Sequence, residues 1–501
     1  MTIVSFNPRT GEVNGATNET PAADVSVAVE RACRTTSAVA AAPPQTRRAW
    51  LHAIGESLEA HAADLVRLAE AETALGVPRL AGELARAAAQ LRFYGDVAAE
   101  GSYLGVAIDD ARGDQPALAR VNEPLGTVAV FGASNFPFAF GVLGNDVASA
   151  LAAGCPVVAK AHPAHPLLSE RLVELAREAL RTERAPADAL ELVAGHEAGR
   201  ALVMAAQIAA VAFTGSQAGG IALWRLANQR DVVIPVFAEM GTVNPVILTP
   251  AAAKRLPEIA SGFVGSYTLG SGQFCTKPGL LLAPEGVGAA QAVGAALAEA
   301  APQPTMLTSA IAEGVRTGLE ALQAAGADVV ERVPAGTRGW SAPAAVLTAP
   351  AKALVRGSRL LGECFGAVAL VVEYADREEL TSVVRQLQGS LAGSVFTALE
   401  GPDEDAEHAI SLLAGQVGRV AVNNWPTGVA FTWAQQHGGP WPATSNPTAT
   451  SVGAAALDRF VRPVTYQSTR DEWLPLATRA ANPWRLPRRH NGRLVLPEGA
   501  W

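Results

Sequence analysis

Cysteine, positive charge and long apolar runs are all scarce in this sequence of 501 residues. Its 4 cysteines form no Cys-x-x-Cys pair and have no histidine at a spacing suited to zinc, so we expect reduced thiols and no metal site. Lys and Arg number 39 against 47 Asp and Glu, with no basic block, which argues against a nucleic-acid partner or an anionic membrane surface. The apolar run 147–159 is interrupted by Pro156 and is shorter than the roughly 20 residues of a membrane-spanning helix. Since the N-terminus also lacks the pattern of a secretory signal, we expect a cytoplasmic protein.

Apolar residues, in contrast, make up 49% of the chain, and charged residues make up only 17%. This balance provides material for large cores and argues against disorder. Because 501 residues exceed the usual size of one domain, we expect two or three domains.

The order of local patterns predicts an α/β fold. From Pro21 to about Gly101 the chain is Ala-rich, with leucines near helical spacing, which is typical of surface helices. Beyond this segment, strands are expected at 126–132, 156–160, 190–193, 208–213 and 232–237, and helices at 138–153, 168–181 and 217–228. Such alternation implies βαβ units and a mostly parallel sheet covered by helices.

A second α/β stretch follows, with strands expected at 244–248, 279–283, 368–372 and 394–397. After about Asp458 the chain is irregular and rich in Pro, Trp and Arg. This composition fits a tail that lies on another subunit.

The loops that follow parallel strands are where ligands bind in such sheets. Asn135 lies in the first of these loops and offers a carboxamide, although Asn is also a common turn former. Lys160 ends the next strand and could reach a ribose or a phosphate. His162 and His165 follow it, but each precedes a proline and the two rings do not share a helical face, so we favour buried or solvent-facing imidazoles over metal ligands.

A glycine-rich turn at 213–220 lies between an expected strand and an expected helix. Its residues Gly215, Ser216 and Gly220 would let backbone N–H groups approach a pyrophosphate. A strand-to-helix turn without a ligand has the same appearance.

Cys275 is the strongest candidate nucleophile, because glycines precede it and Lys277, which could help to lower the pKa of the thiol, follows it. Cys33 and Cys155 lie in apolar contexts that favour inert thiols, and Cys364 is intermediate. Glu239 ends an expected strand in apolar surroundings and is a candidate general base, with a salt-bridged or solvent-facing glutamate as the alternative.

Taken in order, these motifs resemble the aldehyde dehydrogenase superfamily over nearly the whole chain. The similarity is carried by Phe6-Asn-Pro-Arg-Thr-Gly, Ser134-Asn-Phe-Pro, Lys160, Phe213-Thr-Gly-Ser, Glu239-Met-Gly, Gly272-Gln-Phe-Cys and Glu363-Cys-Phe-Gly. The segments Lys160-Ala-His-Pro-Ala-His-Pro and Gln273-Phe-Cys-Thr-Lys-Pro-Gly look like the branch of NADP-preferring fatty-aldehyde and α-ketoglutaric semialdehyde (2,5-dioxopentanoate) dehydrogenases.

The resemblance implies a Rossmann-type cofactor domain at 1–103 and 122–240, an α/β catalytic domain at 241–460, and a small β oligomerisation element with a C-terminal tail at 104–121 and 461–501. It also implies that Cys275 attacks the aldehyde, that Asn135 and the Cys275 backbone N–H hold the oxyanion, and that Glu239 activates the water that hydrolyses the thioester. The resemblance places further residues around the cofactor: Lys160 and Glu363 at the riboses, Phe365 at the nicotinamide, and Gly215, Ser216 and Gly220 at the pyrophosphate.

Two positions bear on the choice of cofactor. Pro163 stands where NAD-preferring members carry a Glu that repels a 2′-phosphate, so this repulsion is missing. Arg200 looks like a position that pairs with the 2′-phosphate in this branch. We therefore expect NADP, with NAD also possible.

The substrate is less clearly encoded. Phe140 and Leu143, counted as one and two helical turns beyond Asn135, are expected to line the tunnel, with Trp425 and Trp441 either at its mouth or simply packed. A dicarbonyl acid needs a cation or several N–H donors for its carboxylate, and no motif supplies an arginine. By resemblance the substrate is α-ketoglutaric semialdehyde, oxidised to 2-oxoglutarate, with a long-chain aldehyde as the alternative.

A different class of enzyme is also open: Cys275 with His437 could form a thiol hydrolase. A homodimer or homotetramer is expected by resemblance.

Overall fold

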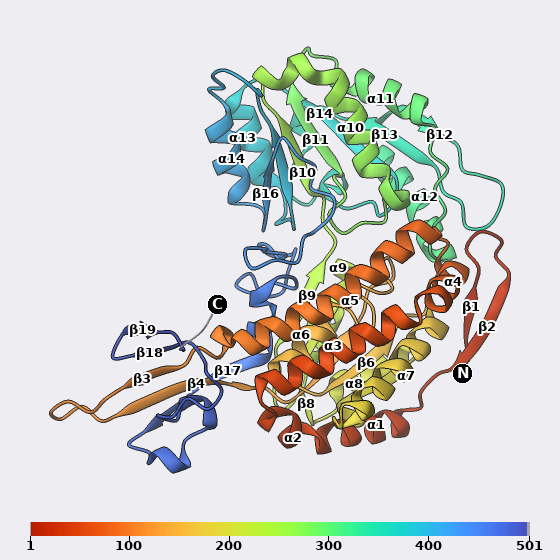
Figure 1. Cartoon of the computed structure of the whole chain (residues 1–501). Helices are drawn as coiled ribbons and strands as arrows, with labels where there is room; N and C mark the ends of the chain where they lie inside the picture. Colours follow the sequence, from red (N-terminus) through yellow and green to blue (C-terminus); the bar gives the residue numbers. More distant parts are fainter. Residues whose placement is uncertain (1, 498–501) are drawn as a thin grey trace.

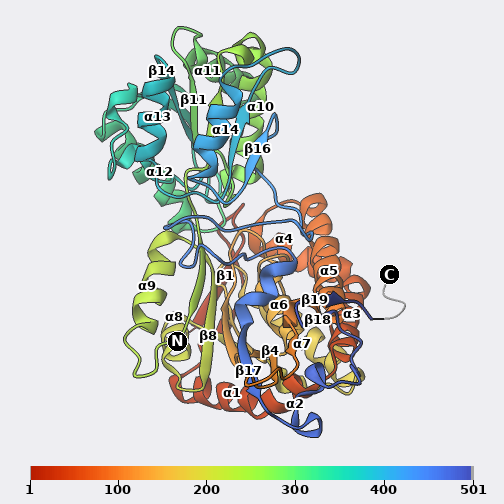
Figure 2. The same ribbon diagram turned by 90° about the vertical axis from the view of Figure 1, so that its left-hand side faces the viewer.

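The computed structural model describes residues 2–497 of the chain. Figure 1 shows a lower body built from the N-terminal half, an upper body built from residues beyond about 245, and an arm of strands that projects from the lower body. The turned view in Figure 2 shows that the two bodies meet through a narrower middle region. No helix within residues 2–497 is long and apolar enough to cross a membrane.

Five helices pack around the lower body, as the Ala-rich pattern predicts. They are α1 (Ala22–Arg34), α2 (Thr36–Ala41), α3 (Pro44–Ala60), α4 (Ala62–Thr73) and α5 (Val77–Glu100). Helix α1 lies on one face of the sheet of this body, and α3 and α5 lie on the other. Helix α5 ends at Gly101, whose φ of +85° is the left-handed conformation that glycine adopts at helix ends. Because α3 and α5 pack along their length, their apolar stripes join the largest core of the protein.

The sheet of the lower body is parallel, which confirms the expected α/β class. Its strand order is β7 (Leu190–Ala194), β6 (Val157–Ala161), β5 (Thr127–Phe131), β8 (Ile208–Gly215) and β9 (Val236–Met240). The helices α6 (Asn145–Ala153), α7 (Pro166–Thr182), α8 (His196–Met204) and α9 (Gln217–Ala227) connect these strands or follow them.

Two of the expected boundaries in this sheet region are wrong. Helix α6 begins at Asn145 and not at 138, because 138–144 form tight turns; a Cβ on Gly141 would lie 2.1 Å from the carbonyl oxygen of Pro137. Strand β9 begins at Val236 and not at 232, since Val232 and Val233 are 72% and 58% exposed and therefore do not belong to the buried strand.

The upper body contains a seven-stranded sheet. Its order is β12 (Asp328–Val333), β13 (Ala344–Thr348), β14 (Val368–Tyr374), β11 (Leu280–Pro284), β10 (Pro245–Leu248), β15 (Gly393–Phe396) and β16 (Val420–Val422), and only the β12–β13 pair is antiparallel. The surrounding helices are α10 (Leu256–Thr268), α11 (Ala289–Ala300), α12 (Ser309–Ala324), α13 (Arg377–Gln386) and α14 (Ala406–Ala414). Ile247 enters one core, while Val246 and Leu248 enter the core on the other face, as the two-residue period of a strand requires.

The arm is a third sheet that joins the middle and the end of the chain. Its order is β17 (Val461–Gln467), β4 (Leu118–Pro124), β3 (Ala107–Asp109), β18 (Arg488–His490) and β19 (Arg493–Val495). The expectation of an irregular tail is therefore wrong over these stretches. Strand β17 pairs with β4 of the same chain in antiparallel register, from Val461 opposite Pro124 to Gln467 opposite Leu118.

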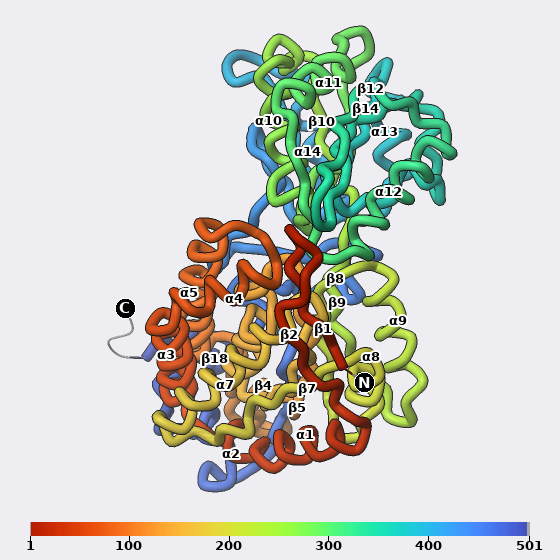
Figure 3. Tube along the Cα trace, turned by 90° about the vertical axis from the view of Figure 1, so that its right-hand side faces the viewer, coloured from red at the N-terminus to blue at the C-terminus, as the bar shows by residue number. Residues whose placement is uncertain are grey.

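An N-terminal hairpin, which the sequence patterns did not predict, links the two bodies. Strands β1 (Thr2–Phe6) and β2 (Val13–Asn18) run along the lower body toward the upper body, as Figure 3 shows. At the turn, the backbone N–H of Trp340 in the upper body donates to the Pro8 carbonyl oxygen at 2.9 Å. The rings of Phe6 and Trp340 lie 5.7 Å apart. The hairpin thus helps to fix the region between the bodies, where the candidate site lies.

Candidate active site

Cys275 lies in a loop that is held on both sides. The loop follows a short 3-10 helix (Leu269–Gly272), and a Cβ on Gly272 would lie 2.1 Å from the carbonyl carbon of Gly366, so only glycine allows this close approach. From the other side, the Asn244 carboxamide donates to the carbonyl oxygens of Cys275 at 2.8 Å and Lys277 at 3.0 Å. The thiol is therefore presented from a rigid backbone.

A histidine and a glutamate lie beside this thiol. The Nε2 atom of His437 is 3.7 Å from the Sγ of Cys275 and 3.1 Å from Oε1 of Glu239. Glu239 is the fourth residue of β9, and its second oxygen accepts a hydrogen bond from the Ser451 hydroxyl. The structure thus brings the expected nucleophile and base together, with a fully buried imidazole next to both.

The electrostatics of the three groups assign them different protonation states. Burial raises the pKa of the Cys275 thiol well above its usual value, and the nearby carboxylates of Glu239 and Glu363 raise it further. Burial acts in the same direction on Glu239, but His437, the Ser451 hydroxyl and Arg459 outweigh it and leave the Glu239 pKa below its usual value. Cys275 is therefore a thiol, and Glu239 is a carboxylate that can act as a base.

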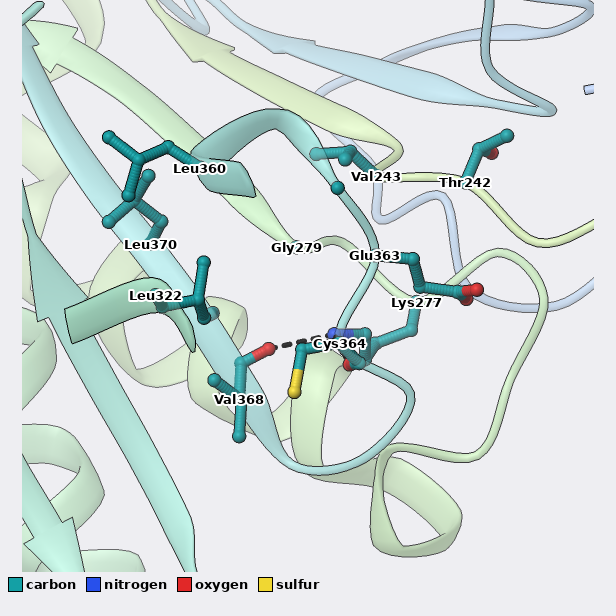
Figure 4. A pocket seen from close by; sticks show the side chains of 12 residues that line it. Thr242, Val243, Lys277, Gly279, Leu322, Leu360, Glu363, Cys364, Val368 and Leu370 are labelled. Carbon is teal, nitrogen blue, oxygen red and sulfur yellow. Dashed lines mark hydrogen bonds between the residues drawn. The ribbon is translucent and has the colours of Figure 1, made fainter. Parts of the chain in front are cut away.

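The expectation that Lys277 lowers the thiol pKa is wrong. Its Nζ donates to the carbonyl oxygens of Cys364 at 3.0 Å and Val368 at 2.7 Å, the second of which is drawn as a dashed line in Figure 4. Lys277 is buried and binds the loop that carries Glu363. It therefore connects the nucleophile loop to a second loop and does not support the thiolate.

Asn135 lies next to the nucleophile loop. Its buried carboxamide donates to the Gln273 carbonyl at 2.7 Å, two residues before Cys275. A carboxamide has two N–H groups, so the second is available to another acceptor. The Arg79 guanidinium donates to the Asn135 carbonyl at 2.7 Å and fixes the backbone there.

Aromatic rings form one wall of the site. Phe140 lies 6.3 Å from the ring of His437 and 5.6 Å from that of Phe136, and Phe136 lies 5.0 Å from Phe274. Phe140 thus lies beside the imidazole, and its role in lining the tunnel stays a prediction. Leu143 does not reach the wall: it is 1% exposed and belongs to the core with α3 and α5. The helical spacing used to place it does not apply, because α6 begins only at Asn145.

The two tryptophans expected near the tunnel mouth have other neighbours. Trp425 packs against Phe396 and Phe263 at ring distances of 4.4 and 6.0 Å, at one of the cores of the upper body. Trp441 is 50% exposed and lies 6.0 Å from Trp224 on α9. Trp425 is therefore a packing residue, and Trp441 lies against the helix that follows the glycine-rich turn.

Comparison with known proteins decides the family. Residues 1–441 match the aldehyde dehydrogenase family. The chain is 41% identical over 508 residues to α-ketoglutaric semialdehyde dehydrogenase 2 of Azospirillum brasilense, a match that covers 98% of this chain and 96% of the relative. The chain belongs to the aldehyde dehydrogenase family. It is therefore an oxidoreductase that acts on aldehydes, as the motif order predicts.

Two further comparisons agree with this assignment. α-Ketoglutaric semialdehyde dehydrogenase of Acinetobacter baylyi is 37% identical over 462 residues, which cover 90% of this chain and 88% of the relative. Among solved structures, a variant of aldehyde dehydrogenase C of Pseudomonas syringae with NAD⁺ and octanal matches with a TM-score of 0.80 at 21% identity, over 93% of each chain. The aldehyde dehydrogenase fold is thus shared even where the sequences have diverged.

Aldehyde dehydrogenases use NAD or NADP, and the carboxyl edge of the lower sheet fits such a cofactor. Lys160 lies at the end of β6, where burial lowers its pKa to about 8. The Lys160 side chain runs past Gly199 of α8: a Cβ added to Gly199 would lie 3.8 Å from the Lys160 Cε. Arg200 is the next residue of this helix. Arg200 is 57% exposed and only loosely paired, 3.7 Å from Glu197. Two cations are therefore available at this edge for ribose or phosphate oxygens.

The glycine-rich turn of this aldehyde dehydrogenase begins helix α9. Ser216 is the N-cap, and its hydroxyl oxygen accepts the N–H of Gly219 at 3.1 Å. A Cβ on Gly215 would lie 2.6 Å from the Phe213 ring, and a Cβ on Gly220 would lie 2.6 Å from the Met240 sulfur. The glycines thus allow α9 to pack closely on β9, and the first turn of the helix remains suited to an anion.

Glu363 lies on the loop that Lys277 holds. Burial raises the pKa of Glu363 to about 7 against the opposing charges of Lys277 and Arg359, and its Oε1 has no hydrogen-bond partner within residues 2–497. The carboxylate lies over Gly241, where a Cβ would be 2.2 Å from Oε2. An unpartnered buried oxygen fits a ribose hydroxyl as its partner. Phe365, two residues on, is half-buried.

Two small cavities flank these groups. The cavity in Figure 4, behind Glu363 and Lys277, has a volume of about 10 Å³, which is at the lower limit for one water molecule. A second cavity, of about 20 Å³, is lined by Glu239, His437, Thr444 and Ser451 among other residues. Its polar lining and size suit one water molecule beside the candidate base.

The histidine pair near Lys160 is not the group that could best hold a metal ion. His162 and His165 are stacked at 5.5 Å, and burial lowers the pKa of both, that of His165 to about 4. The donor atoms of Glu239, Cys275 and His437 lie within 4.8 Å of one another, a spacing that a metal ion could use. The same atoms account for one another, since His437 Nε2 contacts the Cys275 thiol and lies at ion-pair distance from Glu239.

Sequence reasoning missed Ser451 and gave His437 only a role in the hydrolase alternative. Both lie in the segment 423–454, which returns from the upper body to the lower body. The one local signal was the run His437-Gly-Gly-Pro, a polar side chain beside glycines, as at Cys275.

Proposed function

We propose that this aldehyde dehydrogenase oxidises α-ketoglutaric semialdehyde (2,5-dioxopentanoate) to 2-oxoglutarate, with NADP as the acceptor. The observation that carries the proposal is the 3.7 Å contact of Cys275 with His437 beside the ionised Glu239. The substrate is supported by the names of the two relatives that are 41% and 37% identical.

The first step uses the contact between thiol and imidazole. His437 takes the proton of Cys275, and the thiolate attacks the aldehyde carbon to form a thiohemiacetal. The free N–H of Asn135 and the backbone N–H of Cys275 stabilise the negative oxygen that develops. Because burial disfavours the thiolate, the proton transfer to His437 makes the nucleophile available at neutral pH.

The second half of the reaction uses Glu239. When bound, NADP supplies a nicotinamide ring that accepts a hydride from the thiohemiacetal carbon, which leaves a thioester on Cys275. Glu239 then takes a proton from a water molecule, for which the cavity of about 20 Å³ has room, and the resulting hydroxide cleaves the thioester to a carboxylate. The Ser451 hydroxyl orients the base during this step.

The preference for NADP is supported by Arg200 and Pro163. Arg200 is exposed and loosely paired, so its guanidinium can turn to a 2′-phosphate, and Pro163 places no carboxylate near it. Lys160, Gly215, Ser216, Gly220, Glu363 and Phe365 would hold the remaining parts of the nucleotide.

The thiol hydrolase alternative fits the geometry less well. In a hydrolase triad the nucleophile and the acid contact different nitrogens of the histidine. Here one nitrogen, Nε2, faces both Cys275 and Glu239, and Nδ1 is buried without a hydrogen-bond partner in the part of the chain that the structure describes. The arrangement is therefore not that of a hydrolase triad.

A panel of aldehydes crossed with NAD and NADP tests the proposal. We expect the highest kcat/KM with α-ketoglutaric semialdehyde and NADP, followed at the absorbance of reduced nicotinamide. Higher values with a long-chain aldehyde would favour the runner-up substrate, and equal turnover with NAD would contradict the interpretation of Arg200 and Pro163. Cys275→Ala should abolish oxidation while nucleotide binding, measured by calorimetry, is retained. Fast ester cleavage with no aldehyde oxidation would favour the hydrolase.

We further propose a cytoplasmic homodimer or homotetramer that associates through the arm. The domain division at 104–121 and 461–501 is supported by the pairing of β3 and β4 with β17 and β18. Light scattering coupled to gel filtration tests the oligomer: a monomer would contradict it.

A further inference from the structure

Arg86, on helix α5, carries a largely buried guanidinium without a polar partner. Its Nε and Nη2 atoms are buried and make no hydrogen bond, and no carboxylate of residues 2–497 forms an ion pair with it. The guanidinium instead lies over the aromatic ring of Phe431, whose centre is 5.4 Å from the guanidinium carbon. Buried charges in proteins are normally paired, because an unpaired one is costly.

The position of Arg86 connects it to the active site. Phe431 packs against Phe140 and Val452 in one small cluster, and Phe140 lies 6.3 Å from the ring of His437. Burial lowers the pKa of Arg86, and the charges that oppose this effect are, in falling order, those of Glu83, Tyr94 and Cys275. Arg86 is therefore within electrostatic reach of the nucleophile, at the far end of the aromatic wall.

A second cation lies behind a loop that contacts the nucleophile loop, since the Gly428 N–H donates to the Thr276 hydroxyl at 3.2 Å. Arg419, just before β16, donates to the carbonyl oxygens of Pro426 and of Gly428, the latter at 2.8 Å, while its Nε is buried without a partner among the described residues. The Cys275 thiolate acts on its pKa as well, against the larger effect of burial. Arg419 thus holds the 426–428 loop and still has one donor to offer.

The nearest acid on the same helix does not neutralise Arg86. Glu83 lies one turn earlier, and its Oε1 accepts the backbone N–H groups of Phe138 at 2.9 Å and Ala139 at 3.1 Å. Burial raises the pKa of Glu83 to about 7, so its charge is only partly present at neutral pH. Glu83 therefore offsets the positive charge of Arg86 only in part, and the guanidinium N–H groups remain open to a ligand.

We propose that Arg86, assisted by Arg419, binds the carboxylate of the substrate and selects short ω-oxo acids over uncharged aldehydes. A planar guanidinium with free N–H groups binds a carboxylate in two-point geometry, and stacking on Phe431 holds its plane. This proposal rests on the proposed function, because it assigns the far end of the substrate of that same site.

Arg79 provides an internal comparison. It lies on the same helix and between the rings of Phe136 and Phe274, at 5.0 and 4.9 Å, but it donates to the Asn135 carbonyl. Its role is therefore to support the backbone beside Asn135. Of Arg79, Arg86 and Arg419, only Arg86 makes no hydrogen bond to any described residue.

The test compares Arg86→Met with the unaltered enzyme on two aldehydes, α-ketoglutaric semialdehyde and pentanal, at saturating NADP. We expect kcat/KM for the semialdehyde to fall about 100-fold, mainly through KM, and that for pentanal to change by less than about threefold. Arg86→Lys should restore part of the loss. Arg92→Met, on the same helix with its guanidinium paired to Glu59 at the surface, is the control and should change neither value.

An equal fall for both aldehydes, or no fall for either, would overturn the role of Arg86. A complementary measurement needs no variant: glutarate should slow the alkylation of Cys275 by iodoacetamide, and uncharged glutaramide should not. Equal protection by both compounds would also overturn it. If the unaltered enzyme oxidised no aldehyde, the proposed function itself would fail, which is a different result from oxidation that is insensitive to Arg86→Met.

Discussion

The Nε2 atom of His437 lies 3.7 Å from the Sγ atom of Cys275. The same nitrogen lies 3.1 Å from Oε1 of Glu239, so the imidazolium that forms when it accepts the thiol proton is stabilised by the carboxylate. The raised pKa of Cys275 makes such an acceptor necessary at neutral pH.

Replacement of this base gives the first prediction. His437→Gln should lower kcat by roughly 10²–10⁴-fold, the usual contribution of a positioned general base. Alkylation of Cys275 by iodoacetamide at pH 7 should slow as well, because the thiol loses its proton acceptor. Ser451→Ala removes a hydroxyl that contacts Glu239 and the His437 carbonyl oxygen but keeps the imidazole, so the alkylation rate should stay within a few-fold of that of the unaltered enzyme. An unchanged alkylation rate in His437→Gln would exclude this role.

Glu239→Gln should separate the two halves of the reaction. Hydride transfer does not need the carboxylate, whereas hydrolysis of the thioester does, so we expect a burst of reduced nicotinamide followed by slow turnover. Rapid-mixing absorbance measures both phases. Glu197→Gln, an exposed glutamate next to Arg200, serves as a control for the loss of one negative charge. A steady-state rate equal to that of the unaltered enzyme would remove Glu239 as the base.

The pH dependence of cofactor binding should follow Lys160. Burial lowers its pKa to about 8, so the ammonium is present below this pH and lost above it. If it holds a ribose or phosphate, KM for NADP should be constant below about pH 8 and rise above it. Lys160→Arg should remove the rise, because the guanidinium stays charged. The same rise in Lys160→Arg would show that another group is responsible.

Lys277→Met tests the connection between the two loops. The variant leaves the carbonyl groups of Cys364 and Val368 without their donor, which should cost roughly 1–3 kcal/mol of folding free energy for each and lower the Tm. Looser placement of Glu363 should raise KM for NADP about tenfold, while the alkylation rate of Cys275 stays unchanged. A slower alkylation with unchanged KM would instead support the original idea that Lys277 activates the thiol.

Metal ions should inhibit and not assist. EDTA should leave kcat unchanged, because no step that we derive needs a metal. Added Zn²⁺ should inhibit by binding Glu239, Cys275 and His437, whose donor atoms lie within 4.8 Å of one another. The inhibition should be weaker in His437→Gln, measured as the concentration for half-inhibition. Loss of activity in EDTA that Zn²⁺ restores would contradict this account.

The strands and loops that the sequence predicts well are those whose pattern of residues is confined to a short segment. The buried β-branched runs of β5, β6 and β8 and the glycines before Cys275 have signatures within about ten residues. Strand β17 lacks such a signature: its residues are exposed or half-buried, and its partner β4 lies more than 300 positions away. The direction of Lys277 and the approach of His437 to Cys275 depend on similar long-range contacts.

Leu143 shows a different failure. Its expected position came from counting helical turns, but glycines at 141 and 144 allow turns that double back, where a Cβ would lie 2.1 or 2.5 Å from a backbone oxygen. Local propensity was overridden by close backbone packing, which no periodicity in the sequence reveals.

Strand β9, which carries Glu239, is the last strand of its sheet, and its free side is covered by residues 443–445. The N–H of Met240 donates to the Ala443 carbonyl at 2.8 Å, and that of Ala238 donates to the Ser445 hydroxyl at 2.8 Å. An uncovered strand edge tends to pair with other chains. Release of this short segment would therefore displace the base and create a self-associating surface in one event. On heating, the loss of activity and the onset of aggregation should begin at the same temperature.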